Sequence, residues 1–277
     1  MYEALNINTG ETFAVKMVKL VHPYLGLDQQ KVASVKKEIA RFKMLKHKHI
    51  VRYFDSEIIE NNVLCIYMEY VYKSVAKMCT EYGRIGEKNA RMYTQQVLRA
   101  LVYLHNQNII HGDLKGGNVL VSQDGKEIKL CDLGNSLQLK ETASSSQVDV
   151  ESVQSMQSVI SLIASSPAWM APETHYQRVG KKSDVWSLGC LVVEMVTGQN
   201  PWGVRLEGEG NVHMALQKRL ANLERPNIPT HVSAQCQSFI DRCLQHDSKQ
   251  RPYAHVLLND PWIKNKDHAM ASLTPRR

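Results

Sequence analysis

The sequence predicts an α+β fold, in which a small β-rich part precedes a larger helical part. Two observations lead to this prediction. Runs of β-branched and aromatic residues dominate the chain as far as Tyr70, whereas from Asn89 onward apolar residues recur at helical spacing. The length of 277 residues is enough for one large domain or two smaller lobes with an ample core.

The first part is predicted to form strands around one helix. A strand is expected over Thr12–Val18, after the turn signal Asn8-Thr9-Gly10. Apolar residues at helical spacing predict a helix over Val32–Leu45. Two further strands are expected over Val51–Ile59 and Val63–Tyr70, joined through a polar turn.

The second part is predicted to be mainly helical. Ala90–His105 has a long apolar side and is expected to be an amphipathic helix. Helices are also expected over Ser183–Thr197 and Gln235–Gln245. Between these elements, Ser144–Ser166 is rich in Ser, Gln and Val, and we expect part of it to be mobile.

The composition is typical of a soluble, cytoplasmic protein. Hydrophobic residues make up 43% of the chain and charged residues 22%, and neither a membrane span nor a signal peptide is indicated. Six cysteines show no metal-binding spacing and suggest a reducing compartment. The net charge of +7 comes from basic residues interleaved with acidic ones, so we expect no nucleic-acid partner.

The segment with the most chemistry is IIHGDLKGGNVL, which covers Ile109–Leu120. Its spacing suits phosphoryl transfer: Asp113 is placed to accept the proton of a hydroxyl, Lys115 to neutralise a moving phosphoryl group, and Asn118 to hold a metal ion. Alone, the segment can also be a β-turn rich in glycine and charge that matches by chance. Further motifs in the expected order are therefore required.

Five such motifs follow one another along the chain: FAVK at 13–16, CDLG at 131–134, APE at 171–173, DVWSLG at 184–189 and QRP at 250–252. Together with the segment around Asp113, they resemble the motifs of eukaryotic protein kinases, whose catalytic loop reads H-R-D-L-K-x-x-N. The resemblance extends from Tyr2 to about Trp262.

This resemblance implies a bilobal protein kinase fold that binds ATP and magnesium between its lobes. The N-lobe would run through the hinge over residues 1–71, and the C-lobe would cover 72–263 with an activation segment at 132–173. Residues 264–277 would form a basic C-terminal tail.

The resemblance assigns the nucleotide site residue by residue. Lys16 would contact phosphates and pair with Glu38, although Glu38 can also be read as a solvated helix acid. Met68, Glu69 and Val71 would form the gatekeeper and hinge. Two positions, Ala14 and Leu120, would enclose the adenine ring, although either can equally be ordinary core.

The resemblance also assigns the catalytic residues and their supports. Asn118 and Asp132 would bind magnesium beside the catalytic Asp113 and Lys115. Lys115 and Ser166 are typical of serine/threonine kinases, and Ser166 would contact the catalytic loop. The expected structural supports are the ion pair of Glu173 with Arg251, the carboxylate of Asp184, the apolar contact of Phe42 with Leu133, and His111.

Longer phrases such as PAWMAPE and the GCLVVEMVTG helix are similar to MAP kinase kinase kinases. This similarity implies a protein substrate, such as a MAP kinase kinase, in a signalling cascade. The oligomeric state, the upstream activator and any docking partner are not indicated.

The sequence departs from the family pattern in two ways. The resemblance places Met1 just after the glycine-rich loop, so the first strand and the loop that covers the phosphates are absent from this sequence. Either the sequence is incomplete or the protein is naturally short, and in the second case a pseudokinase or scaffold is the alternative function. Gly112 stands where an arginine usually binds the activation-loop phosphate, so we expect loop phosphorylation to act weakly.

Overall fold

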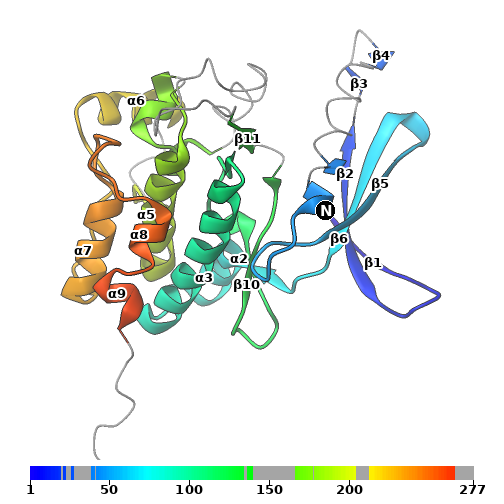
Figure 1. Cartoon of the computed structure of the whole chain (residues 1–277), viewed down its shortest axis with the longest axis horizontal. Helices are drawn as coiled ribbons and strands as arrows, with labels where there is room; N and C mark the ends of the chain where they lie inside the picture. The colour runs from blue at the N-terminus through cyan, green and yellow to red at the C-terminus, as the bar shows by residue number, and fades with distance from the viewer. Residues whose placement is uncertain are drawn as a thin grey trace, which may run out of the picture.

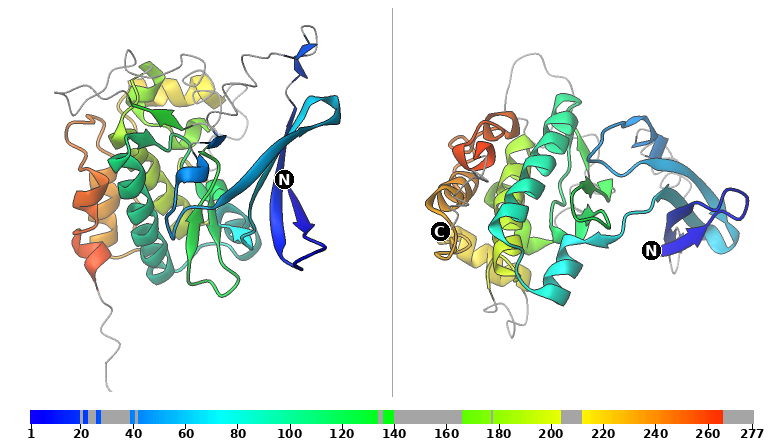
Figure 2. Two further views of the ribbon diagram at one scale, coloured as in Figure 1. Left: turned by 45° about the vertical axis from the view of Figure 1, so that its right-hand side comes forward. Right: turned by 90° about the horizontal axis from the view of Figure 1, so that it is seen from below.

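A β-sheet and a helical lobe make up the computed structural model of this chain, with the sheet on the right and the helices on the left of Figure 1. The structure describes residues 1–19, 21–22, 26–27, 39–40, 42–133, 136–139, 166–176, 178–203 and 212–265. Both views in Figure 2 keep the sheet apart from the helices. The predicted α+β, two-lobed class is confirmed.

Four antiparallel strands form the sheet of the N-terminal lobe, in the order β1-β2-β6-β5. Their bounds are Tyr2–Leu5 for β1, Thr12–Lys19 for β2, Tyr53–Ile59 for β5 and Val63–Glu69 for β6. Strand β6 lies between β2 and β5 and is the most buried of the four, which agrees with its run of apolar residues.

Two turns define the register of this sheet. In the turn between β1 and β2, Asn6 accepts hydrogen bonds from the amides of Asn8 and Thr9, and Gly10 adopts a φ of 73°. Between β5 and β6, a 3₁₀ turn (η1, Glu60–Asn62) ends on Asn62 with a φ of 55°. The predicted strands and their connecting turns are thus confirmed.

Two very short strands, β3 (Val21–His22) and β4 (Gly26–Leu27), pair with each other beyond β2. Of the helix predicted over Val32–Leu45, the described residues 39–40 and 42–44 are helical. Ile39, Phe42 and Leu45 are buried, as the apolar spacing predicts.

The C-terminal lobe is built from helices: α2 (Val75–Tyr82), α3 (Glu87–Asn106), α5 (Lys181–Thr197), α6 (Val212–Ala221), α7 (Ala234–Cys243), α8 (Ala254–Leu257) and α9 (Pro261–Lys264). Helix α5 is apolar around most of its circumference and is buried along nearly its whole length. It packs against α3 and α7 and forms the centre of this lobe.

Short strands hold the segments that carry the candidate site. These are β7 (Lys73–Ser74), β8 (Ile109–Ile110), β9 (Val119–Val121), β10 (Ile128–Leu130) and β11 (Leu137–Gln138). Strand β9 pairs with β7 and β10, and β8 pairs with β11. The segment from His111 to Asn118, which ends in a 3₁₀ turn (η2, Gly116–Asn118), is therefore anchored by a strand at each end.

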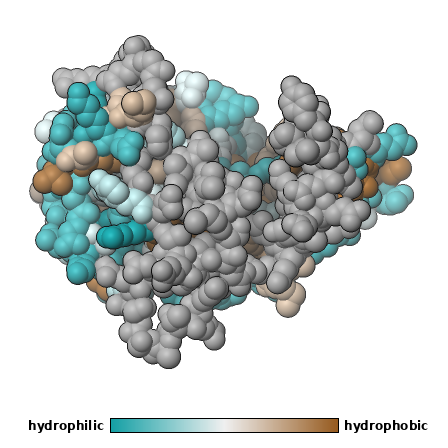
Figure 3. Space-filling view, turned by 90° about the horizontal axis from the view of Figure 1, so that it is seen from above, coloured by the Kyte–Doolittle hydropathy of each residue, from teal (hydrophilic) through white to brown (hydrophobic). Residues whose placement is uncertain are grey.

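The two lobes are joined behind the hinge by backbone hydrogen bonds. The amide of Val51 donates to the carbonyl of Leu130 at 2.8 Å, and the amide of Leu130 donates to the carbonyl of His49 at 2.9 Å. Seen from above, most of the described surface of the helical lobe is hydrophilic, and apolar residues appear at the far end of the sheet (Figure 3). Phe54 and Ile59 of β5 are among the exposed apolar side chains.

Candidate active site

The loop that follows β8 is held in place by Asp184, a buried carboxylate near the start of α5. Asp184 accepts hydrogen bonds from the amides of His111 at 3.0 Å and Gly112 at 2.9 Å, and from His105 Nε2 at 2.7 Å. Burial raises the pKa of Asp184, but the interactions with His105, His111 and the Gly112 amide together outweigh it, so that the pKa lies below its usual value. An ionised Asp184 therefore fixes the backbone directly before Asp113.

Asp113 lies at the centre of a compact polar group. Lys115 Nζ is 2.9 Å from Asp113 Oδ2 and 2.5 Å from Ser166 Oγ. Asn118 Nδ2 donates to Asp113 Oδ2 at 3.0 Å and to the Asp113 carbonyl at 2.7 Å. The structure thus brings together Asp113, Lys115, Asn118 and Ser166, the last of which precedes a 3₁₀ turn (η5, Pro167–Trp169) distant in sequence.

The environment of Asp113 keeps its carboxylate ionised. Burial raises the pKa of Asp113. Hydrogen bonds from Ser166 and Lys115 and the positive charge of Lys115 lower it by more, so the net pKa lies below the usual value. A carboxylate that is only 4% exposed and still charged at neutral pH is a strong hydrogen-bond acceptor. Such a group can orient a hydroxyl and receive its proton as that hydroxyl attacks.

Lys16 and Asp132 form the second charged group of the site. Lys16 Nζ on β2 lies 2.5 Å from Asp132 Oδ1, and both side chains are close to 30% exposed. Asp132 has a φ of 59°, a conformation that non-glycine residues rarely adopt and that occurs at functional sites. Glu38, the expected partner of Lys16, lies outside the described residues.

Cys131, directly before Asp132, connects the backbone of the two groups. The pKa of Cys131 is raised to about 12, mainly by burial, with further effects from the charges of Asp132, Lys16, Asp113 and Lys115. The amide of Cys131 also donates to the carbonyl of Asn118 at 3.0 Å. This backbone bond places Asp132, the partner of Lys16, next in sequence to a residue bonded to Asn118.

The donor set of this site fits a magnesium ion. Asn118 uses its amide nitrogen to donate to Asp113, and within the part of the chain that the structure describes its Oδ1 accepts no hydrogen bond. Asp132 offers a partly exposed carboxylate beside it in the site. Magnesium prefers such oxygen ligands and completes its shell with water and phosphate oxygens, so two protein ligands are sufficient.

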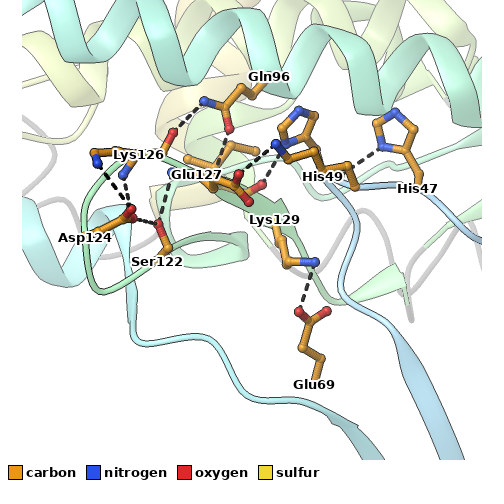
Figure 4. Close-up of polar contacts among 11 residues, drawn as sticks. His47, His49, Glu69, Gln96, Ser122, Asp124, Lys126, Glu127 and Lys129 are labelled. Atoms are coloured by element: carbon orange, nitrogen blue, oxygen red, sulfur yellow. Dashed lines mark hydrogen bonds and ion pairs between the residues drawn. The ribbon is translucent and has the colours of Figure 1, made fainter.

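The residues expected around the adenine ring lie on neighbouring strands. Ala14 of β2 is opposite Met68 of β6, and both are buried. Leu120 of β9 and Val71, just after β6, are half-buried against the core. The Glu69 side chain points to the rear of the hinge, where Oε1 lies 2.9 Å from Lys129 Nζ (Figure 4).

The expected supports occupy buried positions. Arg251 pairs with Glu173 in a 3₁₀ turn (η6, Pro172–Tyr176) and donates to the carbonyl of Lys182 at 2.7 Å. His111 is fully buried, and its Nδ1 accepts the amide of Asp113 at 3.3 Å.

Phe42 and Leu133 are both buried and are linked through Tyr53, a residue that the sequence did not point to. The ring centroids of Tyr53 and Phe42 are 5.7 Å apart, and the Leu133 amide lies 3.5 Å from the Tyr53 hydroxyl.

The sequence also did not indicate Glu194, a buried acid on α5. Its Oε2 accepts hydrogen bonds from the Gly116 amide and from Trp169 Nε1, both at 2.9 Å. Burial raises the pKa of Glu194 more than these hydrogen bonds lower it. Glu194 thus connects the loop after β8 to the segment after Ser166, and no local motif marks it because both contacts are distant in sequence.

Comparison with known proteins agrees with this geometry. The family model for the protein kinase domain matches residues 1–263. The chain is 36% identical over 274 residues to mitogen-activated protein kinase kinase kinase A of Dictyostelium discoideum. This match covers 96% of this chain and 26% of that protein. The chain is 35% identical over 268 residues to mitogen-activated protein kinase kinase kinase YODA of Arabidopsis thaliana, covering 96% of this chain and 28% of that protein.

A third relative is cell division control protein 7 of Schizosaccharomyces pombe, with 36% identity over 266 residues and coverage of 95% of this chain and 22% of that protein. The chain therefore spans about a quarter of the length of these relatives. The match over nearly the whole chain shows that it belongs to the protein kinase domain family. Among the helices of the described residues, none is both long enough and apolar enough to cross a membrane.

Proposed function

We propose that this chain is a serine/threonine protein kinase, which transfers the γ-phosphate of ATP to a hydroxyl of a protein substrate. The observation that carries the proposal is the group around Asp113. Its ionised carboxylate is buried, is fixed by Asn118, and shares the ammonium of Lys115 with Ser166. This arrangement supplies an acceptor for a hydroxyl proton and a cation for the transferred phosphoryl group within hydrogen-bond reach of each other.

In this mechanism, Asp113 orients the substrate hydroxyl and accepts its proton, while Lys115 offsets negative charge on the phosphoryl group. Lys16 holds nucleotide phosphates from the N-terminal lobe. Asn118 and Asp132 would hold Mg²⁺, which neutralises phosphate charge when bound. Phosphoryl transfer depends mainly on positioning and charge, so the rigid support of the loop by Asp184 serves catalysis directly.

The hinge and the pocket wall belong to the same proposal. Glu69 and Val71 would present backbone groups to the adenine edge, next to Met68, while Ala14 and Leu120 would enclose the ring. The N-lobe would extend through residue 71, the C-lobe would cover 72–263 and the tail 264–277. This boundary lies between β6 and β7, where the chain passes from one lobe to the other.

The substrate class is proposed from the relatives. Two of them are named mitogen-activated protein kinase kinase kinases, and we infer that this chain acts on a MAP kinase kinase in a signalling cascade. A cytoplasmic location is supported by six cysteines that are all buried free thiols.

The direct test is transfer of radiolabelled phosphate from Mg-ATP to a generic basic protein by wild type and by Asp113→Asn. The variant keeps the shape of the side chain but removes the proton acceptor. We expect roughly a hundred- to thousand-fold lower rate, which corresponds to about 3–4 kcal/mol of transition-state stabilisation.

Asp124→Asn is the matched control. This variant makes the same chemical change at an exposed acid of the β9–β10 turn, outside the group around Asp113. Equal rates for wild type and Asp113→Asn would refute the catalytic assignment.

A further inference from the structure

A groove lies at the joint between the lobes, and neither Lys16 nor Asp113 is among the residues that line it. It encloses a volume of about 640 Å³ and is lined by Lys43, Leu45, Lys46, His47, Ile50, Arg52, Tyr53, Phe54, Glu69 and Lys129. These residues come from the helix end before Leu45, the connection that follows it, strand β5, the end of β6 and strand β10. The volume is in the range of sites that bind small molecules or short peptide segments.

The groove carries an excess of positive charge. Four of its lining residues are Lys or Arg, against the single acid Glu69. Two of the cations are partly neutralised, since Lys43 pairs with Asp55 and Lys129 lies 2.9 Å from Glu69. The other two, Lys46 and Arg52, are exposed and have no carboxylate partner among the described residues.

Two histidines lie at this groove, His47 in its lining and His49 two residues further along the chain. The pKa of His47 is lowered by burial, and then by the charges of His49, Arg99 and Lys129. The pKa of His49 is also lowered, by burial first, although its hydrogen bond to the carbonyl of Ile128 and the nearby Glu127 act in the opposite direction. Figure 4 shows His47 and His49 on one side of Lys129, and Glu69 paired with Lys129 on the other.

Apolar surface lies next to the unpaired cations. Leu45, Ile50 and Tyr53 are buried in the floor of the groove, whereas the Phe54 ring is 43% exposed. The guanidinium of Arg52 lies 5.1 Å from the centre of that ring. A ligand that combines negative charge with an apolar side chain therefore matches this surface better than a bare anion.

We propose that this groove docks an acidic peptide segment of a partner protein, with carboxylates at Lys46 and Arg52 and an apolar side chain against Phe54. A peptide matches this lining, which mixes apolar and positively charged side chains. Nucleic acid fits less well, because its phosphates would meet the carboxylate of Glu69 and only two cations have no carboxylate partner among the described residues. The residues that line the groove include none of the charged groups proposed for the chemistry, so a docked segment is held by other side chains. The proposal goes beyond phosphoryl transfer and does not depend on it.

The test is binding of a fluorescein-labelled peptide of alternating Glu and Leu residues, measured by fluorescence anisotropy with the full chain. A peptide with Gln in place of Glu is the uncharged comparison. We expect the Glu peptide to bind more tightly and its affinity to fall as salt is added, since exposed charges are screened. The double variant Lys46→Glu/Arg52→Glu should weaken binding about tenfold or more.

The control is Lys88→Glu/Lys218→Glu, which makes the same change in net charge at exposed positions on α3 and α6. Thermal melting of both double variants verifies that each remains folded. Equal binding of the Glu and Gln peptides, or equal losses in the two double variants, would overturn the proposal. Tighter binding of a single-stranded oligonucleotide than of the Glu peptide, lost in the groove variant, would replace the peptide with nucleic acid.

Discussion

Gly112 has a backbone conformation that matters as much as its missing side chain. The sequence draws attention to it because an arginine that binds a loop phosphate is usual at this position. The structure adds that Gly112 has a φ of 77°, where side chains are strained, and that its amide is held by Asp184. Glycine therefore adopts this positive φ next to Asp113 without strain. It also lacks the guanidinium that an arginine at this position would offer to a phosphate.

Replacing Gly112 by arginine should lower stability. We expect a loss of about 1–2 kcal/mol in the free energy of unfolding, from the strain of a side chain at positive φ, as measured by urea denaturation. Gly117→Ala is the control, because a Cβ there would make only ordinary contacts with Lys115. An arginine variant as stable as wild type would show that Gly112 is not required by the backbone.

At the residue scale, local spacing accounts for what the sequence could predict. Asp113, Lys115 and Asn118 were identifiable because they belong to one short segment, and in the structure Lys115 and Asn118 each form a hydrogen bond with Asp113. Glu194 and Tyr53 were not identifiable, because each acts through partners far away in the chain. No periodicity or motif records such contacts.

At the scale of elements, the catalytic loop depends on its close packing against α5. A Cβ on Gly116 would lie 2.7 Å from the carboxyl carbon of Glu194, closer than real contacts allow. Glu194 is buried and holds both the Gly116 amide and the Trp169 indole, so it has little freedom to move aside. The glycine is therefore needed for the approach of loop and helix.

Gly116→Ala should displace Glu194 and separate the catalytic loop from the segment that follows Ser166. We expect a destabilisation of about 1–3 kcal/mol from overpacking, together with slower phosphate transfer. Thermal melting and the transfer assay measure the two effects. Gly117→Ala, one residue further along, should affect stability little, and similar melting temperatures for the two variants would contradict this account.

The elements themselves were predictable where the hydrophobic pattern was long. Helix α3 extends beyond the predicted Ala90–His105 to Glu87–Asn106, because the turns at helix ends carry few core residues. The short strands β7, β8 and β11 were not predicted, since two residues give no periodicity. Most of the predicted activation segment lies outside the described residues.

At the scale of the whole molecule, backbone hydrogen bonds and an ion pair join the two lobes near the end of β6. The backbone hydrogen bonds between His49, Val51 and Leu130 join the sheet to the helical lobe. The ion pair of Glu69 with Lys129 lies in the same region. This attachment keeps Lys16 of one lobe beside Asp132 of the other, which is the condition for a nucleotide site between them.

The α+β class was predictable from the change in pattern near Asn89, because strand and helix periods differ. The sequence alone did not show how the lobes are joined, since the joint consists of backbone hydrogen bonds and of ion pairs between distant segments. The basic groove was equally hidden, because its four cations come from three separate segments of the chain: the helix end, the connection that follows it and β10.

The measurement that tests the central claim most directly is a crystal structure with Mn²⁺ and a non-hydrolysable ATP analogue, in which anomalous scattering locates the metal. Mn²⁺ accepts the same oxygen ligands as Mg²⁺. We predict a metal within about 2.0–2.3 Å of oxygens from Asn118 and Asp132, with the analogue's phosphates beside Lys16. A metal-bound nucleotide held elsewhere, with Asn118 and Asp132 free of metal, would contradict it.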